Sequence, residues 1–368
     1  MPRATASMPA DLSAPMHGAP RVAARRAQPD DAAPIPMRTV GPIRITGPHV
    51  DEDVHVPLAT FETPLWPSVE RGARASTLCG GIRAVVVDER MTRSVIVEAD
   101  DAGGALSAAG ALRERFAEVA AAAAATSRYA ELIDLHTQIV GNLLFVRFAF
   151  RTGDAAGHNM ATLAAQAALD WVCARFPLRY VSISGNYCTD KKVSAVNGIL
   201  GRGRSVVTEM LVSRSVCRRL LHTTPEALVA LHVRKNLIGS VLAGGVRSAN
   251  AHYANMLLAF YLATGQDGAN VVEGSQGMVH AEVRGDALYF SATVPHVIVG
   301  TVGAGKALPF VRRNLARLGC TEPRPVGSNA RRLAVIAAAT VACGELSLLA
   351  AQAHPGELAA AHRRLERP

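Results

Sequence analysis

Two adjacent lysines in the stretch from Ser184 to Arg204 are the side chains that most suggest chemistry. The chain of 368 residues carries 39 Lys and Arg, yet only four of these are lysines. An ammonium is a compact donor with a tunable pKa, whereas a guanidinium pairs bidentately. Held in a polar cleft, the ammonium of Lys191 or Lys192 can polarise a carbonyl and stabilise the alkoxide that forms on hydride attack. A solvated cluster of surface charges is the alternative.

Other side chains are suited to proton transfer. Glu62 in ATFETP and Asp267 in ATGQDG stand at breaks in the secondary-structure pattern. A carboxyl group near Lys191 acts as a proton donor if burial raises its pKa, although each of these residues is, taken alone, more often a turn residue. His252 in NAHYAN is expected to be a hydrogen-bonded helix residue, and His362 a solvated one. No spacing of His, Cys, Asp or Glu predicts a metal site.

The segment from Asp154 to Met160 combines small residues with a predicted helix start. Asp154 is expected to cap that helix, and the small residues after it allow a pyrophosphate to approach the first-turn N–H groups. The segment is not GxGxxG, so it does not indicate a Rossmann fold. Upstream, Arg128 has the charge to pair with the 2′-phosphate that distinguishes NADP from NAD. An ordinary helix start is the alternative.

The elements that position these residues follow an ordered pattern. Strands are predicted at 94–100, 130–141, 143–153 and 179–185, with helices at 105–126 and 154–177. This β-α-β-β-α-β order is that of the ferredoxin-like split unit. We therefore expect an α+β protein. Its parts are a flexible tail (1–36), a large helix-rich domain (37–93 and 184–368) and an inserted ferredoxin-like domain (94–183).

Farther along the chain, Thr224 and Pro225 are expected to begin a helix, as cap and first helical residue. The apolar run from Leu333 to Ala353 is long enough to span a membrane. Because it is rich in alanine and has Gly344 and Glu345 at its centre, a buried helix is predicted instead.

Composition narrows the classes of function. Hydrophobic residues make up 49% of the chain and charged residues 19%, which is enough for a sizeable core. The net charge is +9, but the arginines are scattered and aromatic residues make up only 5%, so nucleic acid is a weak alternative. Phosphate-bearing small molecules fit this charge as well. The six cysteines lack CxxC spacing, which is typical of free thiols in a reducing cytoplasm. No signal peptide is predicted.

Six short segments together resemble hydroxymethylglutaryl-CoA reductase, most closely its biosynthetic NADPH-using class. The family forms PLATTEG, SGNYCTDKK, DAMGMN, NAHAAN, ATGQD and GTVGGG read here PLATFET, SGNYCTDKK, DAAGHN, NAHYAN, ATGQD and GTVGAG. The resemblance extends from about Val40 to His362. It implies a four-electron reduction of hydroxymethylglutaryl-CoA to mevalonate in two steps, with NADPH as reductant and release of CoA.

The resemblance also implies roles for single residues. Lys191 would be the cation on the substrate carbonyl oxygen. Glu62 would donate the proton in the aldehyde reduction, with Asp267 coupled to both. His362 would protonate the departing CoA thiolate, which suits the near-neutral pKa of an imidazole. The implied substrate and CoA residues are Ser68, Arg71, Arg93, Ser184, Asn186, Asp190, Lys192, His222, Lys235, His252 and Asn255. The implied NADPH residues are Ser127, Arg128, Tyr129, Asp154, Ala156, Gly157, His158, Asn159, Met160, Gly303 and Gly305.

At the level of architecture, the resemblance implies that the inserted domain binds NADP. It also implies active sites formed between subunits, hence a homodimer or a higher homo-oligomer. The expected enzyme is cytoplasmic, without the membrane anchor of animal homologues.

Several departures from the family pattern leave alternatives open. Ala156 replaces a methionine, Phe61 stands beside the expected acid, Arg247 stands in a segment where the family has glycines, and His222 replaces a CoA-contacting lysine. The first alternative is a diverged reductase acting on another acyl-CoA thioester in specialised metabolism. The second is a catalytically silent paralogue that binds NADPH.

Overall fold

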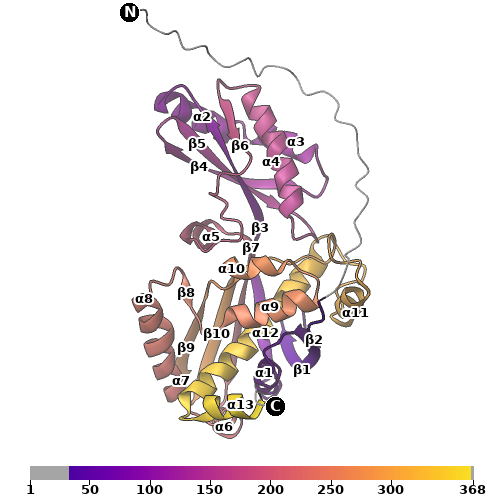
Figure 1. Cartoon of the computed structure of the whole chain (residues 1–368), viewed down its shortest axis with the longest axis vertical. Helices are drawn as coiled ribbons and strands as arrows, with labels where there is room; N and C mark the ends of the chain where they lie inside the picture. Colours follow the sequence, from indigo (N-terminus) through magenta and orange to yellow (C-terminus); the bar gives the residue numbers. More distant parts are fainter. Residues whose placement is uncertain (1–32, 366–368) are drawn as a thin grey trace, which may run out of the picture. The chain divides into compact units, whose positions relative to one another are not determined.

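The computed structural model describes residues 33–365, with the backbone alone for residues 361, 362, 364 and 365 (Figure 1). Residues 1–32 of the predicted tail therefore lie outside the described residues. The fold is of mixed α+β type, as predicted, and two separate clusters of buried apolar side chains form its core.

The larger sheet has the strand order β2-β1-β3-β7-β10-β9-β8. The first three of these strands are β2 (Glu52–Ala59), β1 (Met37–Thr46) and β3 (Ile82–Glu98), and the others are β7 (Gly203–Val212), β10 (Ala287–Val297), β9 (Gly277–Arg284) and β8 (Ser248–Ala249). Along β7 buried side chains alternate with less buried ones, as in a strand with one face on a core. The β1–β3 and β8–β9 pairs are parallel and the other pairs are antiparallel.

Helix α12 (Ser328–Ala353) is the central helix of the larger cluster. It is long and apolar enough to cross a membrane, but 94% of its most apolar window is buried inside the protein. The prediction of a buried helix is therefore confirmed. Gly72 of α1 (Leu65–Leu78) permits close packing on α12, because a Cβ there would lie only 2.1 Å from the Cys343 carbonyl oxygen.

The second sheet is built on the C-terminal half of β3. It has the order β4-β5-β3-β6, with every pair antiparallel, where β4 is Glu131–Val140, β5 is Leu143–Arg151 and β6 is Arg179–Ser182. Helices α2 (Ala102–Glu114), α3 (Phe116–Ala124) and α4 (His158–Cys173) complete this part (Figure 1). The single helix predicted over 105–126 is divided at Arg115. The strand predicted to begin at Ser94 is the end of the longer β3, which runs through both sheets.

The remaining elements carry or flank the candidate site. They are α5 (Ala195–Leu200), α6 (Arg214–Arg219), α7 (Pro225–Leu231), the π-helix η1 (His232–Gly239), α8 (Ser240–Leu242), α9 (Tyr253–Ala263), the 3₁₀ turn η2 (Gly268–Asn270), α10 (Val271–Gly274), α11 (Pro309–Arg317) and α13 (Glu357–Leu365). The predicted start of α7 is confirmed, because the Thr224 side chain accepts from the Ala227 N–H and Pro225 is the first helical residue.

Candidate active site

Lys191 and Asp267 form an ion pair, with 2.6 Å between Nζ and Oδ2. Lys191 lies in the loop before α5, and Asp267 caps η2 by accepting from the Ala269 N–H. The hydrogen bond between them raises the pKa of Lys191 and lowers that of Asp267. The ammonium therefore stays charged at neutral pH, and both side chains remain partly exposed. A carbonyl oxygen placed beside them would meet a fixed positive charge.

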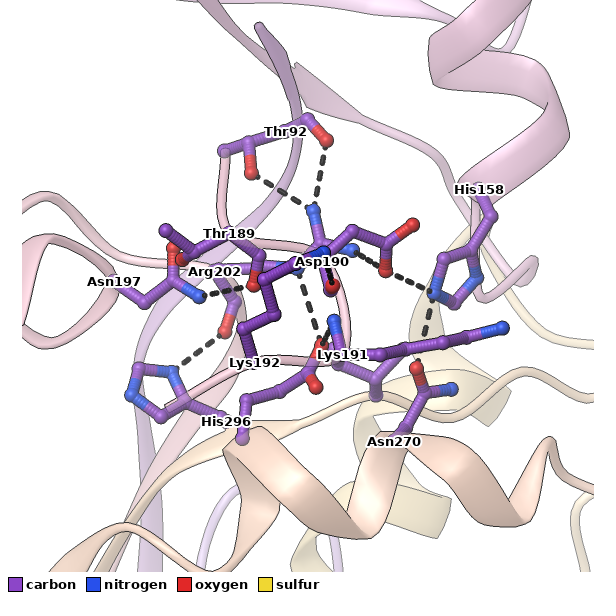
Figure 2. A network of polar contacts seen from close by, with 12 residues as sticks. Thr92, His158, Thr189, Asp190, Lys191, Lys192, Asn197, Arg202, Asn270 and His296 are labelled. Atoms are coloured by element: carbon purple, nitrogen blue, oxygen red, sulfur yellow. Dashed lines mark hydrogen bonds and ion pairs between the residues drawn. The ribbon is translucent and has the colours of Figure 1, made fainter. Parts of the chain in front are cut away.

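A polar network centred on the buried Arg202 adjoins the loop of Lys191 (Figure 2). The Arg202 guanidinium donates to Asp190 Oδ1 (2.5 Å), to the Thr92 carbonyl (2.8 Å) and, through Nε, to Glu273 Oε1 (3.3 Å). Burial raises the pKa of Glu273, while Arg202 acts against this rise. Arg202 thus holds the partly exposed Asp190, and the neighbouring Lys192 is exposed, with its Nζ donating to the Asp190 carbonyl (3.1 Å).

His158, in the first turn of α4, contacts the loop that carries Lys191, residues 183–194, which we call the lysine loop (Figure 2). Its Nε2 lies 3.1 Å from Asn270 Oδ1 and 3.6 Å from Asp190 Oδ1. Burial lowers the pKa of His158, with Arg202 as a further cause. A residue assigned from sequence to the cofactor therefore lies beside residues assigned to the substrate.

The segments DAAG and GTVGAG lie side by side. Ala155 and Val302 form a parallel bridge, and the Thr301 N–H donates to the Asp154 carbonyl (2.8 Å). A Cβ on Gly300 would lie 2.4 Å from the Ala156 N, so only glycine fits this approach. Gly303 and Gly305 have positive φ angles in the same turn, while Asn159 and Met160 lie in the first turn of α4.

The prediction that Asp154 caps the following helix is wrong. Helix α4 begins four residues later than predicted, at His158, because Gly157 precedes it in a left-handed conformation (φ 100°). The Asp154 carboxylate instead accepts from the N–H groups of Gly327 (2.9 Å) and Ala330 (3.0 Å), at the start of α12. Among the described residues no side chain caps α4, so its first N–H groups are available to a ligand.

Arg128 and Tyr129 lie near this turn. The Arg128 guanidinium stacks over the Tyr129 ring at 4.7 Å, and both side chains are exposed. The Ser127 hydroxyl accepts from the Tyr129 N–H, which fixes the bend. The Tyr129 ring lies about 4.0 Å from a Cβ built on Gly153, next to Asp154. The arrangement leaves an exposed cation close to the start of α4.

A second group of predicted residues lines a cavity of about 970 Å³. Six of them contribute to its wall: Glu62, Ser68, Arg71, His222, His252 and Asn255. Lys191 and Asp267 are not among its lining residues. The structure thus divides the predicted catalytic residues between two places, the ion pair and this cavity.

His252 has a defined role in the wall of the cavity. Its Nε2 lies 3.0 Å from the Gly344 carbonyl, so Nε2 carries the proton, and Nδ1 faces the amide of Asn255 at 3.4 Å. Burial lowers the pKa of His252 to about 4, which keeps the ring neutral. A neutral imidazole held in this way is poorly suited to transfer a proton.

Two buried residues that contact the cavity wall, Glu345 and Ser347, were missed by sequence reasoning. The Glu345 carboxylate accepts from the N–H groups of Ala251 (2.8 Å) and His252 (2.6 Å), the two residues before α9. Ser347 accepts from Arg71 and Ser68. Glu345 was visible in the sequence as a charge within an apolar run, but nothing in the sequence indicated its partners. Arg202, Asn270 and Glu273 were missed in the same way, since each acts through residues far away in sequence.

Several other predicted residues belong neither to the ion pair nor to the cavity wall. Arg93 donates to the Thr162 hydroxyl on α4 (3.0 Å), and Lys235 donates to Asn236 (3.4 Å) within the π-helix. Burial lowers the pKa of Lys235. Ser184 and Asn186 are exposed. His362 belongs to α13, but its side chain lies outside the described residues, which contain no cluster of His, Cys, Asp or Glu suited to a metal.

Both the sequence and the fold of this chain are similar to those of known proteins. The family model described as hydroxymethylglutaryl-coenzyme A reductase matches residues 32–367. A 3-hydroxy-3-methylglutaryl-coenzyme A reductase from Aeropyrum pernix is 43% identical over 346 residues, which cover 92% of this chain and 81% of that protein. The enzyme of the same name from Pyrococcus abyssi is 43% identical over 338 residues, covering 90% and 82%.

A solved structure shares the fold. The class II 3-hydroxy-3-methylglutaryl-CoA reductase from Streptococcus pneumoniae, bound to NADPH, aligns with a TM-score of 0.70 over 88% of this chain and 86% of that chain. The sequence identity is 20%, so this comparison concerns the fold alone.

Proposed function

The chain belongs to the hydroxymethylglutaryl-CoA reductase family, and we propose that it reduces (S)-3-hydroxy-3-methylglutaryl-CoA to mevalonate with NADPH, releasing CoA. One observation carries the proposal within this chain: the Lys191 ammonium is held 2.6 Å from Asp267, beside the loops proposed for the cofactor. The overall reaction consumes two hydrides and two protons, and its products are an alcohol and a free thiol.

The ammonium of Lys191 would act on the carbonyl oxygen of the substrate. Negative charge develops on this oxygen in both reductions, first at the thioester carbon and then at the aldehyde carbon. A fixed cation stabilises that charge more in the transition state than in the ground state, which is the condition for catalysis. Asp267 would orient the ammonium and keep its pKa high.

The residues around the start of α4 fit NADPH, which supplies the hydride when bound. The uncapped N–H groups of α4 suit the pyrophosphate, and Gly157 permits the left-handed backbone that precedes them. Arg128 suits the 2′-phosphate because a guanidinium pairs bidentately with phosphate. We propose that this ferredoxin-like unit, inserted at 94–183, is the NADP-binding domain. Its antiparallel order β4-β5-β3-β6 supports this assignment.

The cavity would hold the CoA side of the substrate. Arg71 and His222 offer cationic or donor groups at its wall, and apolar side chains of α12 form its floor. His252 and Asn255 would bind the acyl group, Glu62 would supply the proton to the aldehyde oxygen, and His362 would supply the proton to the thiolate.

A second copy of the chain would bring the two groups of residues together. No residue of the lysine loop lines the cavity within one chain, and the helices η1 and α8 present an apolar face made of Ile238, Val241 and Leu242. These three side chains are 59%, 80% and 87% exposed. We propose that this face contacts a second subunit, as required for active sites that form between subunits. A cytoplasmic location is part of the same proposal, and cell fractionation tests it.

The direct test is oxidation of NADPH by the purified full chain in the presence of hydroxymethylglutaryl-CoA. Mevalonate and free thiol should appear, with two NADPH consumed for each mevalonate. A folded preparation that leaves NADPH untouched would contradict the proposal. A parallel panel of other acyl-CoA thioesters tests the alternative that the chain is a diverged reductase with another substrate. The structural reason to consider this alternative is Phe61, which is exposed beside Glu62.

A further inference from the structure

We infer that Arg202 and Glu273 form a buried positioning pair that sets the backbone of Lys191 and so directs its ammonium toward Asp267. The inference rests on the proposed function only for its kinetic consequences. The contacts themselves belong to the described part of the chain.

The pair holds two successive residues of the lysine loop. Arg202 donates to the side chain of Asp190 through Nη2 (2.5 Å), and Glu273 Oε1 accepts from the backbone N–H of Lys191 (3.2 Å). Arg202 and Glu273 are joined to each other at 3.3 Å. The guanidinium is anchored a third time on Thr92, by the carbonyl oxygen (2.8 Å) and the hydroxyl (3.0 Å). The Arg202 guanidinium is therefore bound to Asp190, Glu273 and Thr92, and it cannot shift without breaking several hydrogen bonds.

The loop needs such support because its backbone is strained. Asn186, Thr189 and Lys191 have φ angles of 56°, 42° and 54°, in the left-handed region that non-glycine residues rarely adopt. A residue stays in this region only when its surroundings determine its conformation more than once. For Lys191 the surroundings are the Glu273 carboxylate on one side and the anchored Asp190 on the other.

The position of Glu273 connects both members of the catalytic ion pair. It lies in α10, which directly follows η2, and Asp267 is the cap residue of η2. The short segment from Asp267 to Glu273 therefore carries the carboxylate that meets the Lys191 ammonium and also the carboxylate that holds the Lys191 backbone. A shift of this segment would move both contacts together.

Burial of this pair is hard to explain by stability alone. The side chains of Arg202 and Glu273 are 1% and 0% exposed. Glu273 Oε2 is buried and has no hydrogen-bond partner among the described residues. Buried ion pairs often contribute no more to stability than well-packed apolar side chains would. A charged pair with one unsatisfied oxygen, directly behind a reactive ammonium, is better explained by the geometry that it imposes.

The test compares Glu273→Leu with Glu273→Gln. Leucine has no acceptor, whereas the glutamine amide keeps an oxygen for the Lys191 N–H. We expect Glu273→Leu to lower kcat at least about tenfold, because a small displacement of a catalytic group is costly. The KM for hydroxymethylglutaryl-CoA and the Kd for NADPH should change less than about twofold. Glu273→Gln should recover most of the kcat.

A matched control separates positioning from general stability. Glu89 on β3 forms a comparable pair with Arg204 on β7 (2.8 Å), but neither residue contacts the lysine loop. Glu89→Leu should lower the melting temperature as much as Glu273→Leu and leave kcat unchanged. If Glu273→Leu does not fold, the double variant Arg202→Met/Glu273→Leu removes both charges, and it should fold but keep the low kcat.

A second measurement does not depend on turnover. The rate at which Lys191 reacts with acetic anhydride, mapped by mass spectrometry, should rise several-fold in Glu273→Leu, since an ammonium released from Asp267 deprotonates more readily. It should stay unchanged in Glu89→Leu. Unchanged labelling of Lys191 in the Glu273 variants would overturn the inference, and so would equal kcat values for the Leu and Gln variants. An inactive wild type with the expected labelling would contradict the proposed function alone.

Discussion

The carboxylate of Asp154 caps the N-terminus of α12 by accepting from the Ala330 N–H at 3.0 Å. The same aspartate begins the turn beside α4 that we assign to NADPH, and its backbone carbonyl accepts from Thr301 in the GTVGAG turn. One residue thus connects the core helix with two of the loops proposed for the cofactor.

Replacing Asp154 by alanine should lower the free energy of unfolding by about 0.5–2 kcal/mol, the usual effect of losing a helix cap. It should also weaken NADPH binding, because the turn loses its anchor on α12. Urea unfolding and NADPH fluorescence titration measure the two effects. Asp101→Ala is the matched control, since Asp101 caps α2 by accepting from the Gly104 N–H (2.7 Å). It should lower stability to a similar extent and leave NADPH affinity intact.

Arg128→Ala should raise the KM for NADPH about tenfold or more and leave the KM for NADH almost unchanged, because only NADPH carries the 2′-phosphate. Steady-state kinetics with both cofactors measures this ratio. Arg115→Ala serves as control, since Arg115 also stacks on an aromatic ring, Trp171, at 5.2 Å. Equal losses for the two cofactors in Arg128→Ala would show that the 2′-phosphate lies elsewhere.

Lys191→Ala should abolish turnover and leave NADPH affinity largely intact, because the ammonium acts on the substrate carbonyl.

The Lys191–Asp267 pair should stabilise the folded protein over a wide pH range. The raised pKa of Lys191 contributes stability below its ordinary value of 10.5, and the lowered pKa of Asp267 contributes stability above its ordinary value of 3.8. The difference in unfolding free energy between wild type and Asp267→Asn should therefore be constant from about pH 5 to pH 9. It should also be small, since both side chains are well exposed. A change of this difference near neutral pH would contradict the assignment.

Glu345 should make the free energy of unfolding fall as the pH rises. An acid whose pKa is lowered on folding has the opposite effect. Burial raises the pKa of Glu345 to about 7 from its ordinary value of 4.5, while the two N–H donors and Lys235 act against this rise. Its contribution to stability is complete below pH 4.5 and is lost as the pH rises through about 7. The stability of the wild type relative to Glu345→Gln should thus fall between pH 5 and pH 8, by at most about 3 kcal/mol. Urea unfolding at both pH values measures it, and a constant difference would contradict the shift.

Leu242→Lys should reduce self-association and turnover together, because it places a charge on the apolar face of η1 and α8. Light scattering coupled to size exclusion measures the oligomeric state. Leu106→Lys is the control, since Leu106 is 65% exposed on α2, outside that face. A Leu242→Lys variant that keeps both the oligomer and the activity would show that another surface mediates assembly.

Local pattern was enough to predict most of the elements. The strands and helices between Ser94 and Ser184 are present in the predicted order, Thr224 and Pro225 begin α7, and the apolar run at Leu333 forms a buried helix. Such features depend on residues within one or two turns of each other, and hydrophobic periodicity, caps and proline positions report on them directly.

The residue types needed for the chemistry could also be found in the sequence, because few lysines remain in an arginine-rich chain and the motif SGNYCTDKK is long. The sequence therefore determined the family, the class of fold and the list of candidate residues. It could not determine which of these residues meet.

Tertiary structure alone decided the partners. Asp154 caps α12 and not α4, Lys191 pairs with Asp267, and Glu62 lies in a cavity with His252. Arg202 and Glu273 attracted no attention in the sequence, yet together they hold the lysine loop. The physical reason is that a cap, an ion pair or a buried network is chosen by distance in space. Chain folding brings together residues that are 70 or more positions apart, as for Lys191 with Asp267 and Asp154 with Ala330, and no local periodicity records such meetings.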